Sequence, residues 1–228
     1  MGRPVLRACR AVGAVAVVVV ATLAGCGPLA GMKLPLPLGE PVDCLAVSDE
    51  LEALIEKGAG TPAARAAAYE KVRRAACDGT AGDAFGRAAV TGRYVEQQGL
   101  LAANLVRDVE YYARRSRELD PGFRDQAATR MLGTLYVLAP AALLKHGDSE
   151  TGLEMLETMA RDHSDVPENH LRLAEAYVVL GDNASACPHV CECLQMRTRL
   201  RRDEQTLLNQ LFTQLTAGGK SLGCSAPQ

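Results

Sequence analysis

Aromatic side chains are scarce in this chain. Its 228 residues include no tryptophan, three phenylalanines and six tyrosines. A core must therefore be built from aliphatic and small side chains, a composition typical of helices that pack through leucine and alanine. The sequence also lacks the alternation of apolar and polar residues that marks half-buried strands, and any Asn-Gly hairpin turn. These absences argue against a β-sheet fold and indicate an all-α domain.

Neither sign of charge predominates, and two common catalytic motifs are missing. The 25 lysines and arginines and 27 aspartates and glutamates give a formal charge of −2. Without a basic surplus, we expect no nucleic-acid partner and no electrostatic attachment to a membrane surface. Neither a Walker-type glycine-rich loop nor a His-Glu-x-x-His zinc motif occurs. We therefore expect a protein that is not an enzyme, with no catalytic residue, cofactor or metal ion.

An apolar run long enough to span a membrane is also lacking. The apolar stretch of residues 11–23 follows three arginines and leads into small residues before Cys26. This order is typical of a lipoprotein signal, so we expect cleavage before Cys26 and attachment of diacylglycerol to its thiol. A transmembrane helix is the alternative. However, Gly25, Gly27 and Pro28 interrupt the stretch well short of the ~20 apolar residues that a span needs.

The signal divides the chain into four parts. Residues 1–25 form the signal peptide, 26–43 the lipidated cysteine and a proline-rich tether, 44–217 the helical domain, and 218–228 a C-terminal tail. The mature chain keeps 22 basic and 27 acidic residues, for a formal charge of −5. We place it on the periplasmic side of a bacterial membrane. Gly27 follows the cysteine where an aspartate would favour the inner membrane, so the outer membrane is favoured.

Start and stop signals divide the helical domain into about nine helices. Thr61-Pro62 supplies a cap and a proline for the first helical position, and Gly181-Asp182-Asn183 is a turn cluster. The charged run 197–202 is interpreted as a solvated helix end. The expected helices cover residues 48–57, 62–77, 83–98, 100–119, 124–137, 149–161, 167–180, 188–199 and 203–215.

Two of these helices share a repeat pattern. Leu132-Gly133-x-x-Tyr136 recurs as Leu173-Ala174-x-x-Tyr177, each in the first helix of a pair, and Gly152 lies in the helix after the first copy. In tetratricopeptide repeats the small residue permits close helix approach, while the leucine and tyrosine pack into the second helix. We therefore predict a tetratricopeptide-like array of helical hairpins, an α-solenoid. A generic antiparallel helical array is the alternative.

Several stretches together carry a family resemblance. They are Tyr111-Tyr112-Ala113, Leu119-Asp120-Pro121, Gly133-Thr134-Leu135-Tyr136, Pro140, Gly147-Asp148, Leu173-Ala174-Glu175-Ala176-Tyr177 and Leu207-Leu208-Asn209-Gln210. The region from Ala84 to Leu215 resembles the T component of TRAP transporters, a family of helical periplasmic lipoproteins. The resemblance implies an accessory protein that docks with a solute-binding partner and helps to deliver a hydrophobic ligand. It implies no catalytic residues.

Cysteine usage fits an exported protein. Six cysteines remain once the signal peptide is removed and Cys26 is lipidated. An even number in an oxidising compartment favours disulfides. If the first two helices form an antiparallel hairpin, the start of the first lies beside the end of the second. We therefore predict a disulfide between Cys44 and Cys77.

Four further cysteines lie near the C-terminus, and the cluster from Cys187 to Cys193 departs from the family pattern. Cys224 follows the last helix and can approach Cys187 or Cys191, so the pairing of these residues and Cys193 stays open. Because His189 lies among them, a metal or redox site is an alternative to structural disulfides. Their spacing matches neither paired Cys-x-x-Cys zinc ligands nor a thioredoxin-like motif.

We expect the domain to bind a partner. Apolar and aromatic side chains left over from packing would line the site, and the candidates are Tyr136, Leu138, Pro140, Leu143 and Tyr177. The expected partner is a periplasmic solute-binding protein or transporter subunit, and a hydrophobic ligand is a second candidate. The alternatives are a general scaffold for envelope assembly or secretion, and a thiol redox or metal-binding protein.

Overall fold

The computed structural model describes residues 42–219 and 221–224, and every regular element in them is helical. The predicted signal peptide, the lipidation site Cys26 and nearly all of the tether lie outside these residues. None of the described helices is long and apolar enough to cross a membrane. The described elements are α1 (Cys44–Glu56), α2 (Pro62–Val72), α3 (Ala81–Gln98), η1 (Gly99–Leu105), α4 (Val106–Leu119), α5 (Phe123–Leu138), η2 (Ala141–Leu143), α6 (Ser149–Asp162), α7 (Pro167–Val179), α8 (Asn183–Gln195), η3 (Arg197–Arg199) and α9 (Arg202–Leu215).

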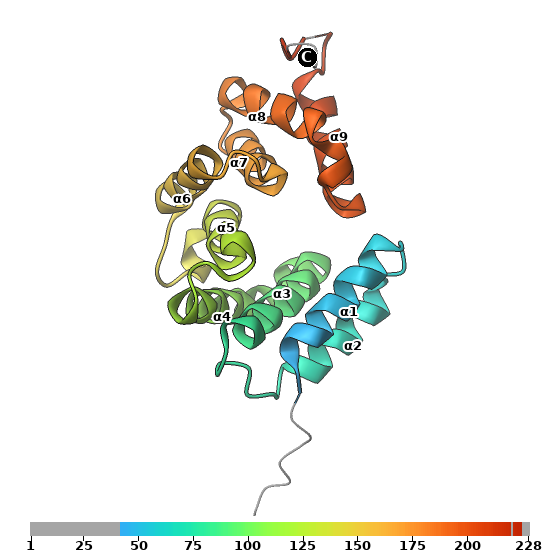
Figure 1. Cartoon of the computed structure of the whole chain (residues 1–228), viewed down its shortest axis with the longest axis vertical. Coiled ribbons are helices and arrows are strands. Elements are labelled where there is room, and N and C mark those ends of the chain that lie inside the picture. Colours follow the sequence, from blue (N-terminus) through green and yellow to red (C-terminus); the bar gives the residue numbers. More distant parts are fainter. Residues whose placement is uncertain (1–41, 220, 225–228) are drawn as a thin grey trace, which may run out of the picture. The chain divides into compact units, whose positions relative to one another are not determined.

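The helices form an array of stacked pairs (Figure 1). Consecutive helices pack as α1 with α2, α3 with α4, α5 with α6, and α7 with α8. The first helices of neighbouring pairs also touch, so α1 contacts α3, α3 contacts α5, α5 contacts α7, and α7 contacts α9. This arrangement confirms the predicted all-α helical array.

Apolar burial runs along the array in four clusters, each shared by neighbouring helices. One joins α1 to α3, the next α3 to α5, the third α5 to α7 and the last α7 to α9. Leu51, Leu132, Leu156 and Leu208 are fully buried representatives of the four. Each unit therefore stabilises mainly its neighbours, as in repeat proteins.

Two glycines of the repeat pattern set the crossing of α5 and α6. A Cβ atom added at Gly133 would lie 2.8 Å from the Leu156 side chain. One added at Gly152 would lie 2.7 Å from the backbone oxygen of Gly133. Because a backbone atom cannot move aside cheaply, only glycine permits this approach. The close packing that the repeat predicts is therefore present.

We expect Gly152→Ala and Gly92→Ala to change stability in opposite directions. Gly152→Ala should lower the free energy of unfolding by about 1–3 kcal/mol, because the new methyl group overpacks the crossing. Gly92 lies inside α3 with open space around its added Cβ, so Gly92→Ala should raise it by about 0.5–1 kcal/mol through helix propensity alone. Urea unfolding of both variants measures this. A stabilising Gly152→Ala would contradict the close crossing.

Several predicted helix boundaries are wrong. α1 begins at Cys44 instead of Ser48, because the Asp43 carboxylate accepts a hydrogen bond from the Ala46 amide at 2.8 Å. α8 begins at Asn183, capped by Asp182, so Pro188 lies inside the helix and does not start it. Local capping by aspartate decided both starts.

The start of α5 also departs from prediction. Arg124, Asp125 and Gln126 all have positive φ angles, between 47° and 58°. Left-handed backbone is unfavourable for residues with a Cβ, so tertiary contacts must hold it. The guanidinium of Arg124 donates two 2.7 Å hydrogen bonds to the Asp49 carboxylate of α1. The helical pattern of the sequence gave no sign of this contact.

Candidate binding site

A hollow with a cavity volume of about 470 Å³ lies against α4. Its walls come from α4, from the connection between α2 and α3, and from the loop before α6. We call it the basic hollow, because four of its nine lining residues are arginine or lysine and three are acidic. Its lining residues are Asp78, Arg107, Glu110, Tyr111, Arg114, Arg115, Glu118, Lys145 and His146.

One stripe of α4 supplies much of this lining. Arg107, Tyr111, Arg114 and Glu118 follow one another at spacings of four, three and four residues, which places them on one face of a helix. The opposite face, with Val109 among its residues, is buried in the array. Packing of the apolar face therefore turns the charged stripe outward.

A buried carboxylate holds the second wall in place. Glu110 is only 1% exposed, and its two oxygens accept hydrogen bonds from the backbone amides of Lys145 at 2.8 Å and His146 at 2.7 Å. A buried carboxylate needs such partners, since an unpaired one is costly. Glu110 thus fixes the loop over α4 and leaves the side chains of Lys145 and His146 exposed at the rim.

Positive charge in the basic hollow is only partly neutralised. In residues 42–219 and 221–224, neither Arg107 nor Lys145 forms an ion pair. Arg114 and Arg115 approach an acidic group only at 3.9 Å, to Glu118. Guanidinium groups bind carboxylates with two parallel hydrogen bonds, and exposed tyrosine adds contact area. The arrangement therefore suits an anionic group presented by a partner.

Tyr136, a predicted ligand residue, lies beneath this surface. It is 3% exposed and packs in the α3–α5 cluster. Burial raises the pKa of Tyr136. Of two residues that line the hollow, Arg114 lowers this pKa and Glu110 raises it. The hydroxyl nevertheless makes no hydrogen bond of good geometry. Tyr136 is thus a core residue and is not among the residues that line the basic hollow.

The other predicted ligand residues are not brought together. Leu138 and Pro140 are exposed at the end of α5, and Leu143 is half-buried in η2. Tyr177 lies on α7, where its hydroxyl donates a 2.6 Å hydrogen bond to Glu157. None of them lines the basic hollow. Sequence reasoning missed the hollow, although the stripe on α4 is visible in the sequence.

The predicted disulfide between Cys44 and Cys77 is present, with Cα atoms 6.1 Å apart. A second disulfide joins Cys191 to Cys224, which resolves the pairing that the sequence left open. Of the described cysteines, Cys187 and Cys193 form no disulfide.

The sequence has a Gly-x-Ser-x-Gly pattern at residues 219–223. In hydrolases this pattern holds its serine on a tight turn between a strand and a helix. Here it follows α9, and Ser221 lies in non-helical backbone where its hydroxyl accepts a hydrogen bond from the Gly223 amide. Residues 221–224, the part of this segment that the structure describes after Gly219, contain no strand or helix.

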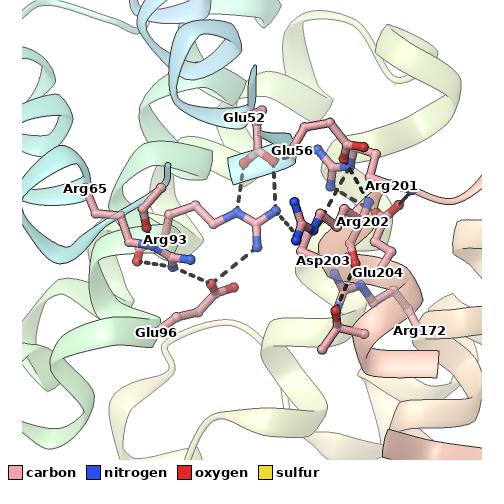
Figure 2. A network of polar contacts seen from close by, with 12 residues as sticks. Glu52, Glu56, Arg65, Arg93, Glu96, Arg172, Arg201, Arg202, Asp203 and Glu204 are labelled. Atoms are coloured by element: carbon pink, nitrogen blue, oxygen red, sulfur yellow. Dashed lines mark hydrogen bonds and ion pairs between the residues drawn. The ribbon is translucent and has the colours of Figure 1, made fainter. Parts of the chain in front are cut away.

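An ion-pair network joins α1, α3 and α9 (Figure 2). The Arg93 guanidinium donates hydrogen bonds to both Glu52 oxygens at 2.8 Å and to Asp203 at 2.8 Å. Arg201 binds Glu52 at 2.6 Å and Glu204 at 2.9 Å. We call these five residues the clasp. They connect the first pair of helices to the last helix, which none of the four apolar clusters does.

Four of the five side chains of the clasp are largely shielded from solvent, whereas Arg201 is 42% exposed. The side chains of Arg93, Glu52 and Asp203 are 12%, 19% and 24% exposed. Burial by itself would lower the pKa of Arg93, but Glu52, Glu96 and Asp203 raise it above the ordinary value. Burial would raise the pKa of Asp203, yet Arg93 and Arg201 hold it below its usual range. The prediction that residues 197–202 form only a solvated helix end is therefore wrong for Arg201, which binds Glu52 and Glu204.

Two imidazoles pair between α7 and α8. The Nδ1 atoms of His170 and His189 lie 2.9 Å apart, and His170 Nε2 lies 2.9 Å from the Ser164 carbonyl oxygen. Since that oxygen can only accept, His170 donates through Nε2 and its Nδ1 accepts from His189 when both rings are neutral. Burial, and then the proximity of His170, lowers the pKa of His189 below 6.5.

This pair predicts a loss of stability on acidification. The unfolded chain gains a proton on His189 near pH 6.5, whereas the folded chain resists it. The stabilisation is therefore complete above about pH 6.5 and is lost as the pH falls through the folded pKa. We expect the free energy of unfolding to drop between pH 7.5 and 5.5 in the native protein, and to drop less in His189→Gln. His146→Gln, at an exposed position, is the control and should keep the native profile; equal profiles for all three proteins would contradict the prediction.

Comparison with known protein families found none that matches this sequence, and no curated protein matches it either.

Proposed function

We propose that this protein is a non-enzymatic, lipid-anchored helical-repeat protein of the periplasm that docks with a solute-binding or transporter subunit. Its role would be similar to that of the T component of TRAP transporters. The observation that carries the docking proposal is the basic hollow, where Arg107 and Lys145 form no ion pair with any residue that the structure describes and lie beside the exposed Tyr111. The lipoprotein signal and the helical array support the location and the class of protein.

The charge of the basic hollow supports an acidic partner surface. The chain as a whole carries a formal charge of −2, whereas the lining of the hollow has four arginine or lysine residues against three acidic ones. Complementary charge speeds encounter and fixes orientation, while arginine and tyrosine dominate the energy of many protein interfaces. Tyr111 is the only residue among the lining with a large apolar surface. We therefore assign the hollow to a protein partner and not to a hydrophobic ligand.

Charge reversal tests the proposal. Arg107→Glu with Lys145→Glu should lower recovery of the partner from detergent-solubilised membranes by at least about 10-fold, the equivalent of ~1.4 kcal/mol. The matched control is Lys57→Glu with Arg161→Glu, which makes the same charge change at two other exposed positions. Mass spectrometry identifies and quantifies the proteins recovered with each variant.

Equal recovery by the two double variants would contradict docking through the basic hollow. Recovery of secretion or envelope-assembly components, with no transporter or solute-binding subunit among them, would contradict the proposed partner. In that case the general scaffold would be the better description.

A further inference from the structure

Cys187 and Cys191 lie one turn apart on α8, and the Cys187 thiol donates to the Asn183 carbonyl oxygen at 3.2 Å. Cys191 is bonded to Cys224, and Cys187 lies four residues earlier on the same helix without a disulfide. Residues four apart on a helix are neighbours on its surface. Cys187 is half-buried and lies one turn from a disulfide-bonded sulfur.

The tail passes the same part of the molecule. Leu222 and Cys187 both pack against the α7–α9 cluster. Residues 216–219 and 221–223 are non-helical, with positive φ angles at Gly218, Gly219 and Gly223. Glycine adopts many backbone conformations at low cost, and three of the described residues before Cys224 are glycines with positive φ angles.

Cys193, the second cysteine without a disulfide, is a poor participant. It is buried in the α7–α9 cluster, and its thiol donates to the backbone oxygen of Pro167 at 3.5 Å. Burial, followed by nearby glutamates, raises the pKa of Cys193 to about 12. Since the thiolate is the nucleophile in exchange, Cys193 is held in its unreactive form. Of the four C-terminal cysteines, Cys187 is therefore the one whose thiol can take part in exchange.

We propose that Cys187 exchanges with the Cys191–Cys224 disulfide, so that the tail is tied to α8 through either of two bonds. The Cys187 thiolate attacks Cys224 Sγ, the Cys187–Cys224 bond forms, and the Cys191–Cys224 bond breaks. Cys191 Sγ leaves as a thiolate and takes up the proton that Cys187 gave up. One disulfide and one thiol are present before and after, so the step needs no oxidant or reductant.

Exchange would move the anchor of the tail along α8. Cys187 and Cys191 are one helical turn apart, about 5.4 Å along the axis. The contact of Leu222 with the α7–α9 cluster would shift with it. The tail therefore has two covalently fixed positions. This inference is independent of the proposed docking function.

Disulfide mapping of the full chain tests the exchange. After incubation at pH 8.5 and quenching with an alkylating agent, fragment-ion mass spectrometry should find both Cys191–Cys224 and Cys187–Cys224 in the native protein. Cys187→Ser should retain only Cys191–Cys224, and Cys193→Ser should behave as the native protein does. Absence of Cys187–Cys224 from the native protein would overturn the proposal.

A second variant tests whether Cys187 can reach Cys224 even if exchange in the native protein is slow. Cys191→Ser, produced in the periplasm, should form Cys187–Cys224, because the alternative bond is then the only one in reach. An unpaired Cys224 in that variant, or its pairing between two chains, would overturn the proposal.

Discussion

Arg93→Ala is expected to lower the free energy of unfolding by about 3–5 kcal/mol, because it removes one partner from a buried ion-pair network. Arg93 binds carboxylates from both α1 and α9 and is only 12% exposed. Without Arg93, the negative charges of Glu52 and Asp203 would lose a cation that pairs with both of them inside the protein. Urea unfolding monitored by circular dichroism measures the change.

The matched control is Arg161→Ala. Arg161 pairs with its neighbour Asp162 at the exposed end of α6, so its removal should have little effect. Replacing Arg93 together with both of its clasp partners, by Glu52→Gln with Arg93→Met and Asp203→Asn, should restore much of the stability, because the remaining Arg201 and Glu204 still pair with each other. A small effect of Arg93→Ala would contradict the view that the clasp fastens the two ends of the array.

Removing the disulfide between Cys44 and Cys77 is the second change with a large expected effect. Replacing both residues by alanine should lower the free energy of unfolding by about 3–4 kcal/mol, since the bond closes a loop between residues 33 apart in sequence. Thermal and urea unfolding of the double variant under non-reducing conditions measures the change.

The other disulfide offers a matched comparison. Cys191 and Cys224 are also 33 residues apart, so the chain-entropy model predicts a similar loss when both are replaced by alanine. Cys44 and Cys77 are fully buried, whereas Cys224 is exposed. The first pair should therefore cost somewhat more through lost packing. A loss below about 1 kcal/mol for the first pair would contradict its assigned role.

Local signals in the sequence were sufficient for much of the fold. Thr61 caps α2 and Pro62 begins it, as the Thr-Pro pair predicts. The hairpin formed by α1 and α2 places Cys44 beside Cys77, so their disulfide follows from helix geometry. Each inference rests on residues close in sequence or on one helical pair.

The clasp was not predictable in the same way. Its contacts join residues 110 and 149 positions apart, such as Arg93 to Asp203 and Glu52 to Arg201. Charged residues on helices are usually solvated, and no periodicity in one sequence says which of them meet across the array. The backbone at Arg124 shows the same limit, because its contact with Asp49 crosses the array.

The candidate site was missed for a different reason. The prediction assumed that aromatic and apolar side chains not needed for packing would line the site. Tyr136 and Tyr177 instead pack between neighbouring helices. The exposed stripe on α4 carries charge beside Tyr111, and its importance depends on the loop that Glu110 holds opposite it. That pairing of helix and loop is a tertiary contact.

The most direct test of the docking proposal is photo-crosslinking from the basic hollow. A benzophenone-bearing amino acid in place of Tyr111 would be introduced into the full chain, with the same residue at the exposed position of Arg161 as the control. We predict that irradiation of membranes yields one discrete adduct from position 111, containing a solute-binding or transporter subunit, and none from position 161. Absence of an adduct at position 111, or the same adducts from both positions, would contradict docking through this surface.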